Sequence, residues 1–196
     1  MHATYLQSTN IFRIFVVTEQ KDNMKKVTII LIVMMLFSST NAQKNLSVVP
    51  SVDLNKYAGT WYEIARLPNS FESKLKCITA TYSLREDGRI TVLNKGHYIS
   101  NPEKINTAKG VAWVPDKTNP AKLKVQFFWP FSGNYWIMEL DKDYRYVLIG
   151  EPSFKYLWIL ARDKNLDETT LQMLKKKAID ASYDLSKLIM VEHDCR

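Results

Sequence analysis

The sequence is poor in the residues and motifs on which catalysis and metal binding usually depend. Its 196 residues include three histidines and two cysteines. It has no Ser–His–Asp set at a recognisable spacing and no glycine-rich phosphate loop. His193 and Cys77 are too few for a zinc site, and the acidic group Glu139, Asp141 and Asp143 lacks the ligand pattern of a calcium loop. We therefore expect no metal, no cofactor and no enzymatic activity.

Long hydrophobic runs are also scarce. The run Val27–Phe37 is too short to span a membrane. It follows two lysines and ends in small polar residues, which is the pattern of a signal peptide over residues 24–42. We expect residues 1–23 to be a spurious extension and residues 43–196 to be the mature domain. The exported domain would be periplasmic or secreted, and soluble because no lipoprotein cysteine lies near the cleavage region. Association with an outer membrane stays open.

The chain has no concentrated stripe of lysine or arginine and no nucleic-acid-binding motif, which excludes nucleic acid as a partner. Its formal net charge is +7, and removal of residues 1–42 leaves about +5. A basic excess spread along the chain serves solubility, with peripheral contact to an anionic membrane surface as the alternative. The protein would be a monomer or a homodimer.

The two cysteines, Cys77 and Cys195, allow two interpretations. In an exported protein an even number of cysteines favours a disulfide. This one would close a loop of about 118 residues and contribute roughly 4–5 kcal/mol to stability. Alternatively, Cys77 is a free thiol that acts as a nucleophile.

Short strand-like segments follow one another through the mature domain, after a helical turn near Asp53–Tyr57. Turn signals such as Asp87–Gly88 separate them, and Pro130 to Gly133 should interrupt the chain between the fifth and sixth. Eight strands joined by short turns predict an all-β, eight-stranded antiparallel up-and-down β-barrel that can hold one small ligand. The expected strands are Thr60–Arg66, Ile78–Leu84, Ile90–Ile99, Asn106–Val114, Lys122–Trp129, Asn134–Leu140, Tyr144–Ile149 and Tyr156–Ala161.

The pattern changes near the C-terminus. Apolar residues recur at helical spacing within Asp167–Ser182, which predicts one C-terminal α-helix packed outside the barrel. Asn165 or Asp167 can cap this helix. A short last strand, Leu188–Val191, is expected before the final cysteine. The apolar stripe of the helix consists of Leu171, Leu174, Ala178 and Ala181.

Three motifs suggest a family. Gly59 and Trp61 stand two apart in GTWYEIAR, at the start of the first expected strand. Asp141 in ELDKDY fits a second motif whose threonine and tyrosine positions are altered here, and Arg162 ends YLWILAR. Together with CITATYSL and NPAKLKVQFFWPF, these motifs resemble the lipocalin family, in its bacterial lipocalin and apolipoprotein D branch, over about residues 52–195.

The resemblance implies a lipocalin calyx that is closed at one end. Strand alternation puts Trp61, Glu63 and Ala65 on one face, so Trp61 would plug the closed end. Gly59 would let the chain cross that end closely. Arg162 would stack on the indole ring of Trp61. We expect these residues to be structural rather than chemical.

The resemblance also places a ligand in the middle and open end of the barrel. Small residues at Ala80 and Ala108 leave room there, as apolar ligand sites require. An inward Glu63 would either meet a polar ligand head or a water, or pair with a nearby cation. The expected ligand-binding residues are Glu63, Ala80, Tyr82, Val92, Asn94, Ala108, Val125, Phe127, Tyr135 and Trp158.

The function that the resemblance implies is binding, storage or transport of a small hydrophobic ligand. A fatty acid or a lysophospholipid fits, handled in support of membrane maintenance, with its polar head at the open end. The resemblance also pairs Cys77 with Cys195 in a disulfide. The alternative is a lipocalin-type isomerase that uses Cys77 as its nucleophile.

Overall fold

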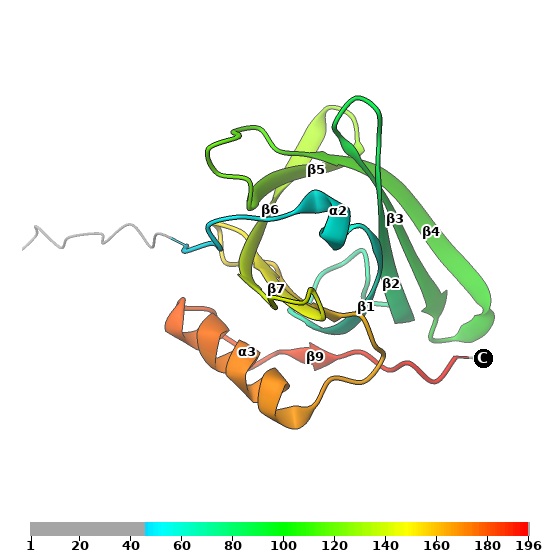
Figure 1. Ribbon diagram of the computed structural model, residues 1–196. Coiled ribbons are helices and arrows are strands. Elements are labelled where there is room, and N and C mark those ends of the chain that lie inside the picture. Colours follow the sequence, from blue (N-terminus) through cyan, green and yellow to red (C-terminus); the bar gives the residue numbers. More distant parts are fainter. Residues whose placement is uncertain (1–45, 196) are drawn as a thin grey trace, which may run out of the picture. The chain divides into compact units, whose positions relative to one another are not determined.

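A computed structural model describes residues 46–195, and Figure 1 views the barrel close to its axis. The expected all-β architecture is confirmed: eight antiparallel strands form the wall, with one further strand and a helix outside it. The elements are α2 Leu54–Tyr57, β1 Gly59–Arg66, β2 Leu75–Leu84, β3 Ile90–Tyr98, β4 Asn101–Trp113, β5 Lys122–Phe128, β6 Phe131–Leu140, β7 Tyr146–Gly150, β8 Leu157–Ala161, α3 Glu168–Asp180 and β9 Ile189–Met190.

Strand β1 closes the barrel. Each strand from β2 to β8 pairs with the next, and β1 pairs with β8 on one side and β2 on the other. Trp61 lies opposite Ala80 of β2, while Glu63 lies opposite Leu160 of β8. Closure pairs the backbone groups that an open sheet would expose at its edges, so the strands enclose a stable interior.

The C-terminal segment completes the wall where β1 and β2 separate. Beyond Tyr62, β1 pairs with β9 instead of β2. The backbone N–H of Val191 donates to β1 over 2.9 Å, and the N–H of Cys77 on β2 donates to the carbonyl of Glu192 over 2.8 Å. A disulfide joins Cys77 to Cys195. The end of the chain is thereby fixed to both strands.

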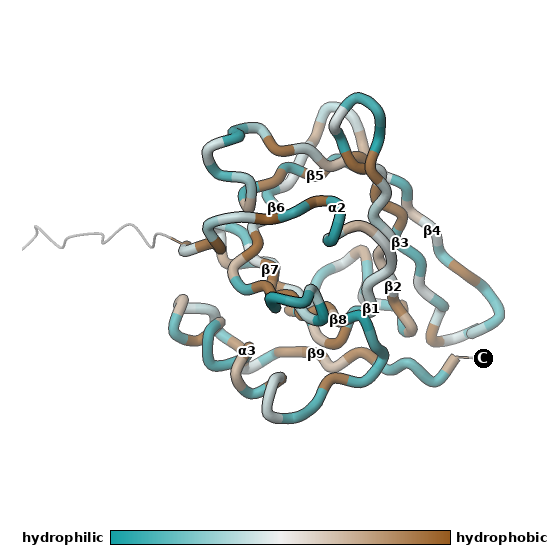
Figure 2. Tube along the Cα trace, in the orientation of Figure 1, coloured by the Kyte–Doolittle hydropathy of each residue, from teal (hydrophilic) through white to brown (hydrophobic). Residues whose placement is uncertain are grey.

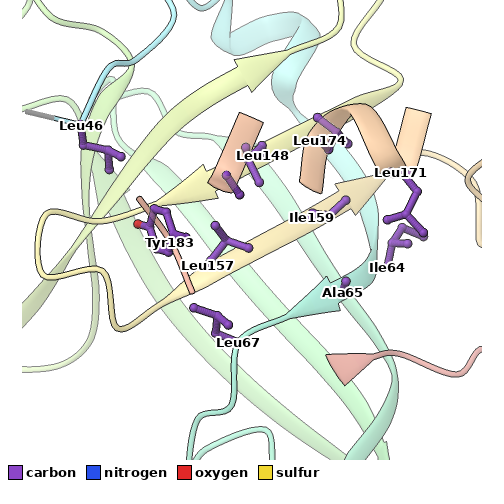
Figure 3. Close-up of a cluster of buried hydrophobic side chains, with 12 residues drawn as sticks. Leu46, Ile64, Ala65, Leu67, Leu148, Leu157, Ile159, Leu171, Leu174 and Tyr183 are labelled. Atoms are coloured by element: carbon purple, nitrogen blue, oxygen red, sulfur yellow. The ribbon is translucent and has the colours of Figure 1, made fainter. Parts of the chain in front are cut away.

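A bulge in β1 makes one expectation wrong. The pairing register with β8 shifts between Glu63 and Ala65, and the extra residue ends the simple alternation of faces. Ala65 therefore does not share the inward face of Trp61 and Glu63. It belongs to the buried cluster beneath α3 (Figure 3). Arg66 turns inward in its place and pairs with Glu63.

Helix α3 covers the outside of the barrel, as predicted (Figure 1). The Asp167 side chain caps it by accepting a hydrogen bond from the N–H of Thr170 over 2.9 Å. Leu171, Leu174 and Ala178 are buried against apolar side chains of β1, β7 and β8 (Figure 3). One apolar stripe is sufficient because only one face of the helix meets the sheet.

Several strand ends differ from expectation. Strand β4 begins at Asn101 rather than Asn106, because a tight turn lets it pair with the whole of β3. Strand β6 begins at Phe131, so the interruption expected over Pro130 to Gly133 is confined to Trp129–Pro130. The remaining strand ends shift by a few residues. Hydrogen bonding to a neighbouring strand decides where a strand ends, and the residues of one strand do not reveal its register with that neighbour.

The proposed extension (residues 1–23) and signal peptide (residues 24–42) lie outside the described residues. Within residues 46–195, neither helix combines the length and hydropathy that crossing a membrane would require. Figure 2 shows hydrophobic and hydrophilic residues interchanging along the barrel strands. That interchange is the sequence signature of a wall with two different faces.

Candidate ligand-binding site

Trp61 and Arg162 close one end of the barrel. The Trp61 side chain is fully buried, its indole N–H donates to the carbonyl of Tyr57 over 2.9 Å, and the Arg162 guanidinium carbon lies 3.9 Å from the ring centroid. Helix α2 crosses this end (Figure 1). Gly59 has a φ of +98°, and a Cβ there would lie 3.2 Å from an Arg162 nitrogen. The expected stacking is therefore present, and Gly59 is required by backbone conformation.

Arg162 also ties the crossing segment to the barrel. Its guanidinium donates to the carbonyls of Thr60, Lys56 and Ala58 over 2.9, 2.7 and 2.9 Å. A carbonyl-lined guanidinium satisfies backbone groups that have no strand partner at a barrel end. These contacts support the structural role expected for Arg162, which stays a prediction.

Asp141 shapes the turn between β6 and β7 beside this end. Its carboxylate accepts from Arg145 Nε over 2.8 Å and from Arg145 Nη2 over 3.0 Å. These side-chain hydrogen bonds, more than any other cause, lower the pKa of Asp141 to about 2. The neighbouring acids are also paired, Glu139 with Lys177 and Asp143 with Lys142. The three acids are thus each paired with a cation, and the Asp141 carboxylate is buried at the centre of the turn.

Three tyrosines form the floor of the interior above the Trp61 plug. The Tyr57 and Tyr82 hydroxyls lie 2.6 and 2.8 Å from the hydroxyl of Tyr135. Burial raises the pKa of each of the three phenols. The phenols are therefore neutral, and their hydroxyl groups are hydrogen-bonded to one another.

A cavity of about 630 Å³ opens above this floor. It falls within the range of pockets that bind small molecules. All ten residues that the sequence singled out as ligand-binding line it. The strands β1 to β6 and β8 supply these side chains, because alternate residues of each strand point to the interior. That these residues contact a ligand stays a prediction; the geometry shows that they share one space.

One wall of the cavity carries a buried charged group. Arg66 Nη1 donates to Glu63 Oε1 over 2.9 Å, and Arg66 Nη2 donates to the backbone carbonyl of Glu72 over 2.9 Å. Trp158 Nε1 donates to Glu72 Oε2 over 3.1 Å. Burial, and after it the charge of the Glu72 carboxylate, raises the pKa of Glu63 well above its usual value. The positive charge of Arg66 partly offsets this increase. Of the two expected roles for Glu63, pairing with a cation is present.

Asn94, on the cavity side of β3, is the other polar side chain expected to contact ligand. Its Oδ1 atom is enclosed by protein and has no hydrogen-bond partner within residues 46–195. A buried polar atom without a partner costs stability. Because this oxygen is enclosed, it could meet a polar atom of a ligand only if the Asn94 side chain turned, and contact between Asn94 and a ligand stays a prediction.

Aromatic side chains surround the open mouth. Phe128 and Phe131 flank the turn between β5 and β6, and each is 77% exposed. Phe71 and Tyr156 come from the loops on the other side, where their rings lie 5.9 Å apart. All four also line the cavity. The cavity wall therefore continues outward into an exposed apolar surface.

Sequence reasoning missed several lining residues. Glu72, Phe71 and Tyr156 lie in loops, where no strand alternation assigns a side chain to a face. Arg66, which lies behind the lining and pairs with Glu63, was missed because the bulge in β1 reverses its direction. The one available signal was the FFWPF run itself, since exposed turns seldom carry so many aromatic residues.

The disulfide bears on both interpretations of Cys77, as a disulfide partner and as a free nucleophilic thiol, because it is present in the structure and leaves Cys77 without a free thiol. Cys77 Sγ is bonded to Cys195, and Cys77 is not among the residues that line the cavity. Cys77, Asp194 and Cys195 also form the one cluster in residues 46–195 with donor atoms close enough for a metal. Two of these three donors are joined in the disulfide, so the cluster lacks the free thiolates that metal binding needs.

A closed eight-stranded barrel with one plugged end and a deep, mainly apolar cavity defines a class, the β-barrel proteins that hold small hydrophobic molecules. The chain belongs to the lipocalin family. The family model of the lipocalin-like domain matches residues 52–193, which includes every strand described above.

Individual proteins with similar sequences or structures extend the comparison beyond the family model. The outer membrane lipoprotein Blc of Escherichia coli K12 is 40% identical over 157 residues, covering 79% of this chain and 87% of that protein. Apolipoprotein D of Macaca fascicularis is 37% identical over 154 residues, covering 75% and 80%. Among solved structures, insecticyanin from the tobacco hornworm Manduca sexta superposes with a TM-score of 0.60 at 24% identity, over 76% of this chain and 84% of that one. The structural likeness supports the fold.

Proposed function

We propose that this protein binds and carries a small hydrophobic ligand, a fatty acid or a lysophospholipid, in its barrel cavity in support of membrane maintenance. The observation that carries the proposal is the cavity of about 630 Å³ above the tyrosine floor. Burial of an acyl chain there contributes about 25 cal/mol for each Å² removed from water. The disulfide leaves no thiol for the isomerase alternative, so the proposal contains no chemical step.

Replacement of Trp158 by alanine tests the cavity as the binding site. Trp158 lines the cavity and its indole N–H holds Glu72. We expect Trp158→Ala to weaken binding of a fluorescent fatty acid about tenfold, because a large apolar contact is lost. Titration of fluorescence against protein concentration gives the dissociation constant.

Two variants serve as controls for this titration. Trp136→Ala removes a tryptophan that packs on the outer cluster, outside the cavity lining, and should leave the affinity unchanged. Trp158→Phe keeps an aromatic wall without the N–H donor. An unaltered affinity in a folded Trp158→Ala protein would show that the ligand binds elsewhere.

We propose that the protein acts after export, as a soluble periplasmic or secreted carrier that touches membranes peripherally. Two named relatives support export: one is called an outer membrane lipoprotein and one an apolipoprotein. The aromatic mouth supports the membrane contact, because Trp129 at its tip is 86% exposed. A chain of this size can act as a monomer or a homodimer.

A further inference from the structure

The cavity lining is unbalanced in charge. It includes the carboxylates of Glu63, Glu72 and Glu151, and no lysine, arginine or histidine from the described residues. Glu151 is fully engaged: its carboxylate accepts from the backbone N–H groups of Ser153, Lys155 and Tyr156. Glu151 therefore keeps its negative charge but has its acceptors occupied, which leaves Glu63 and Glu72 as the candidate ligand contacts.

Arg66, the cation beside Glu63 and Glu72, already interacts with both acids. Its guanidinium lies behind the two acids, 3% exposed and outside the cavity lining. It donates to Glu63 Oε1 and to the Glu72 backbone, and its Nε lies 3.9 Å from Glu72 Oε2. One guanidinium thus faces two carboxylates, which leaves an excess negative charge on this wall when both are ionised.

The two acids also act on each other. Glu63 is 3% exposed and Glu72 is 6% exposed. Their side chains are hydrogen-bonded to each other, which raises the pKa of Glu63. A hydrogen bond between two carboxyl groups needs a proton on one of them, and one guanidinium serves both acids. Two buried acids with so few donors favour a ligand that supplies donors.

We infer that Glu63 and Glu72 bind the head group of the ligand, and that this head group is an ammonium group rather than a carboxylate. The inference rests on the proposed function and narrows its ligand to single-chain lipids whose head carries an ammonium group, which a lysophospholipid can have and a fatty acid cannot. An ammonium group offers three donors and balances the excess negative charge. A carboxylate would add negative charge to a wall whose two acids already share one guanidinium.

The protonation behaviour of Glu63 agrees with this assignment. Burial and the Glu72 carboxylate raise the pKa of Glu63. The other groups that face it are Arg66, which stabilises its charge, and Tyr82, a neutral phenol on β2. The raised pKa reflects the cost of burying one carboxylate beside another, and a ligand ammonium would reduce that cost.

Three ligands with the same chain and different heads test the inference: dodecylamine, dodecanol and dodecanoate. Each displaces an uncharged fluorescent probe from the full-length protein at neutral pH. We expect dodecylamine to bind about tenfold more tightly than dodecanoate. In the double variant Glu63→Gln/Glu72→Gln this preference should disappear, while dodecanol binds as before, because glutamine keeps a carbonyl acceptor for Arg66 and Trp158.

Glu103→Gln is the matched control, since Glu103 is an exposed acid on β4 outside the cavity lining, and it should keep the preference. If the double variant does not fold, the single variant Glu63→Gln carries the same comparison. Tighter or equal binding of dodecanoate by the native protein would overturn the inference, and so would a preference that survives in the variant. Failure of dodecanol to bind the native protein would instead overturn the proposed function.

Discussion

At the scale of single residues, the closed end depends on the contact between Trp61 and Arg162. The indole fills the end of the barrel and the guanidinium covers it at 3.9 Å. The arginine then uses its remaining donors for the backbone of the α2 segment. One side chain thereby satisfies two needs of a barrel end, a packed ring face and paired carbonyl groups.

Replacement of Trp61 by alanine should destabilise the protein without changing its ligand preference. The side chain is fully buried, so its loss leaves a large void and costs about 3–5 kcal/mol. Urea unfolding followed by circular dichroism measures the loss. Retention of native stability within 1 kcal/mol, on the scale of ordinary surface substitutions, would contradict the role of Trp61 as a plug.

Asp141 should make stability depend on pH in the acid range. Its pKa in the folded protein is about 2, below the ordinary value of 3.8. The ionised carboxylate therefore contributes stability above pH 4, and this contribution is lost as the pH falls towards 2. We expect Asp141→Asn to cost about 1–2 kcal/mol at pH 7, a value reduced because Arg145 is largely exposed to water.

The comparison requires thermal unfolding of both proteins from pH 7 down to pH 2, where their difference should shrink. Asp143→Asn is the matched control in the same turn, because that exposed carboxylate pairs only with the exposed Lys142. A difference between native protein and Asp141→Asn that stays constant over this range would contradict the account.

At the scale of elements, the turn between β5 and β6 unites the cavity with the outer surface. Phe128 and Phe131 line the mouth, and Trp129 projects between them. Ile99 is exposed and lies in the turn between β3 and β4. Its backbone N–H donates to the carbonyl of Lys74 in the neighbouring loop. Monomeric soluble proteins rarely expose apolar patches of this kind unless the patch has a partner.

The double variant Trp129→Ser/Phe131→Ser should lose membrane contact. We expect its binding to vesicles of phosphatidylcholine and phosphatidylglycerol to fall at least tenfold, because two aromatic contacts with the bilayer are removed. Co-sedimentation with vesicles measures the bound fraction.

The matched control for this experiment is Leu84→Ser/Ile179→Ser, which removes two exposed apolar side chains from the end of β2 and from α3, away from the mouth. Vesicle binding that falls equally in both double variants, or in neither, would show that the mouth is not the contact surface.

The elements also show what a sequence reveals and what it does not. Eight strands and the helix were predictable because turn residues and apolar periodicity are local signals. The bulge at Glu63 and Ala65 left no such signal, since the register of β1 depends on β8 nearly 100 residues away. That one shift moved Ala65 outward and Arg66 inward, and the charged wall of the cavity could not be foreseen without it.

At the scale of the whole molecule, the C-terminal segment supplies the strand that extends the wall where β1 and β2 separate. Strand β9 pairs with β1 where β2 departs, and the Cys77–Cys195 disulfide holds the last residues against β2. Helix α3 covers the outer side of β7 and β8 (Figure 3). Inside the barrel, side chains around Trp61 pack the closed end, and the residues above them surround a space of about 630 Å³.

The ten expected cavity residues were placed by resemblance to a family rather than by periodicity. A single alternating strand does not reveal which of its faces is inward when both faces carry apolar residues, as in β8. The loop residues of the mouth needed the folded structure, because their direction follows from packing between loops. The identity of the ligand can be established by one measurement.

The most direct test of a lipid carrier is mass spectrometry of the molecules that leave the cavity. The protein should be purified without detergent, measured intact under native conditions and then extracted with organic solvent. We predict one equivalent of a single-chain lipid in the native protein, and less in Trp158→Ala purified in parallel. A native protein that carries no lipid and takes none up from vesicles would contradict the account.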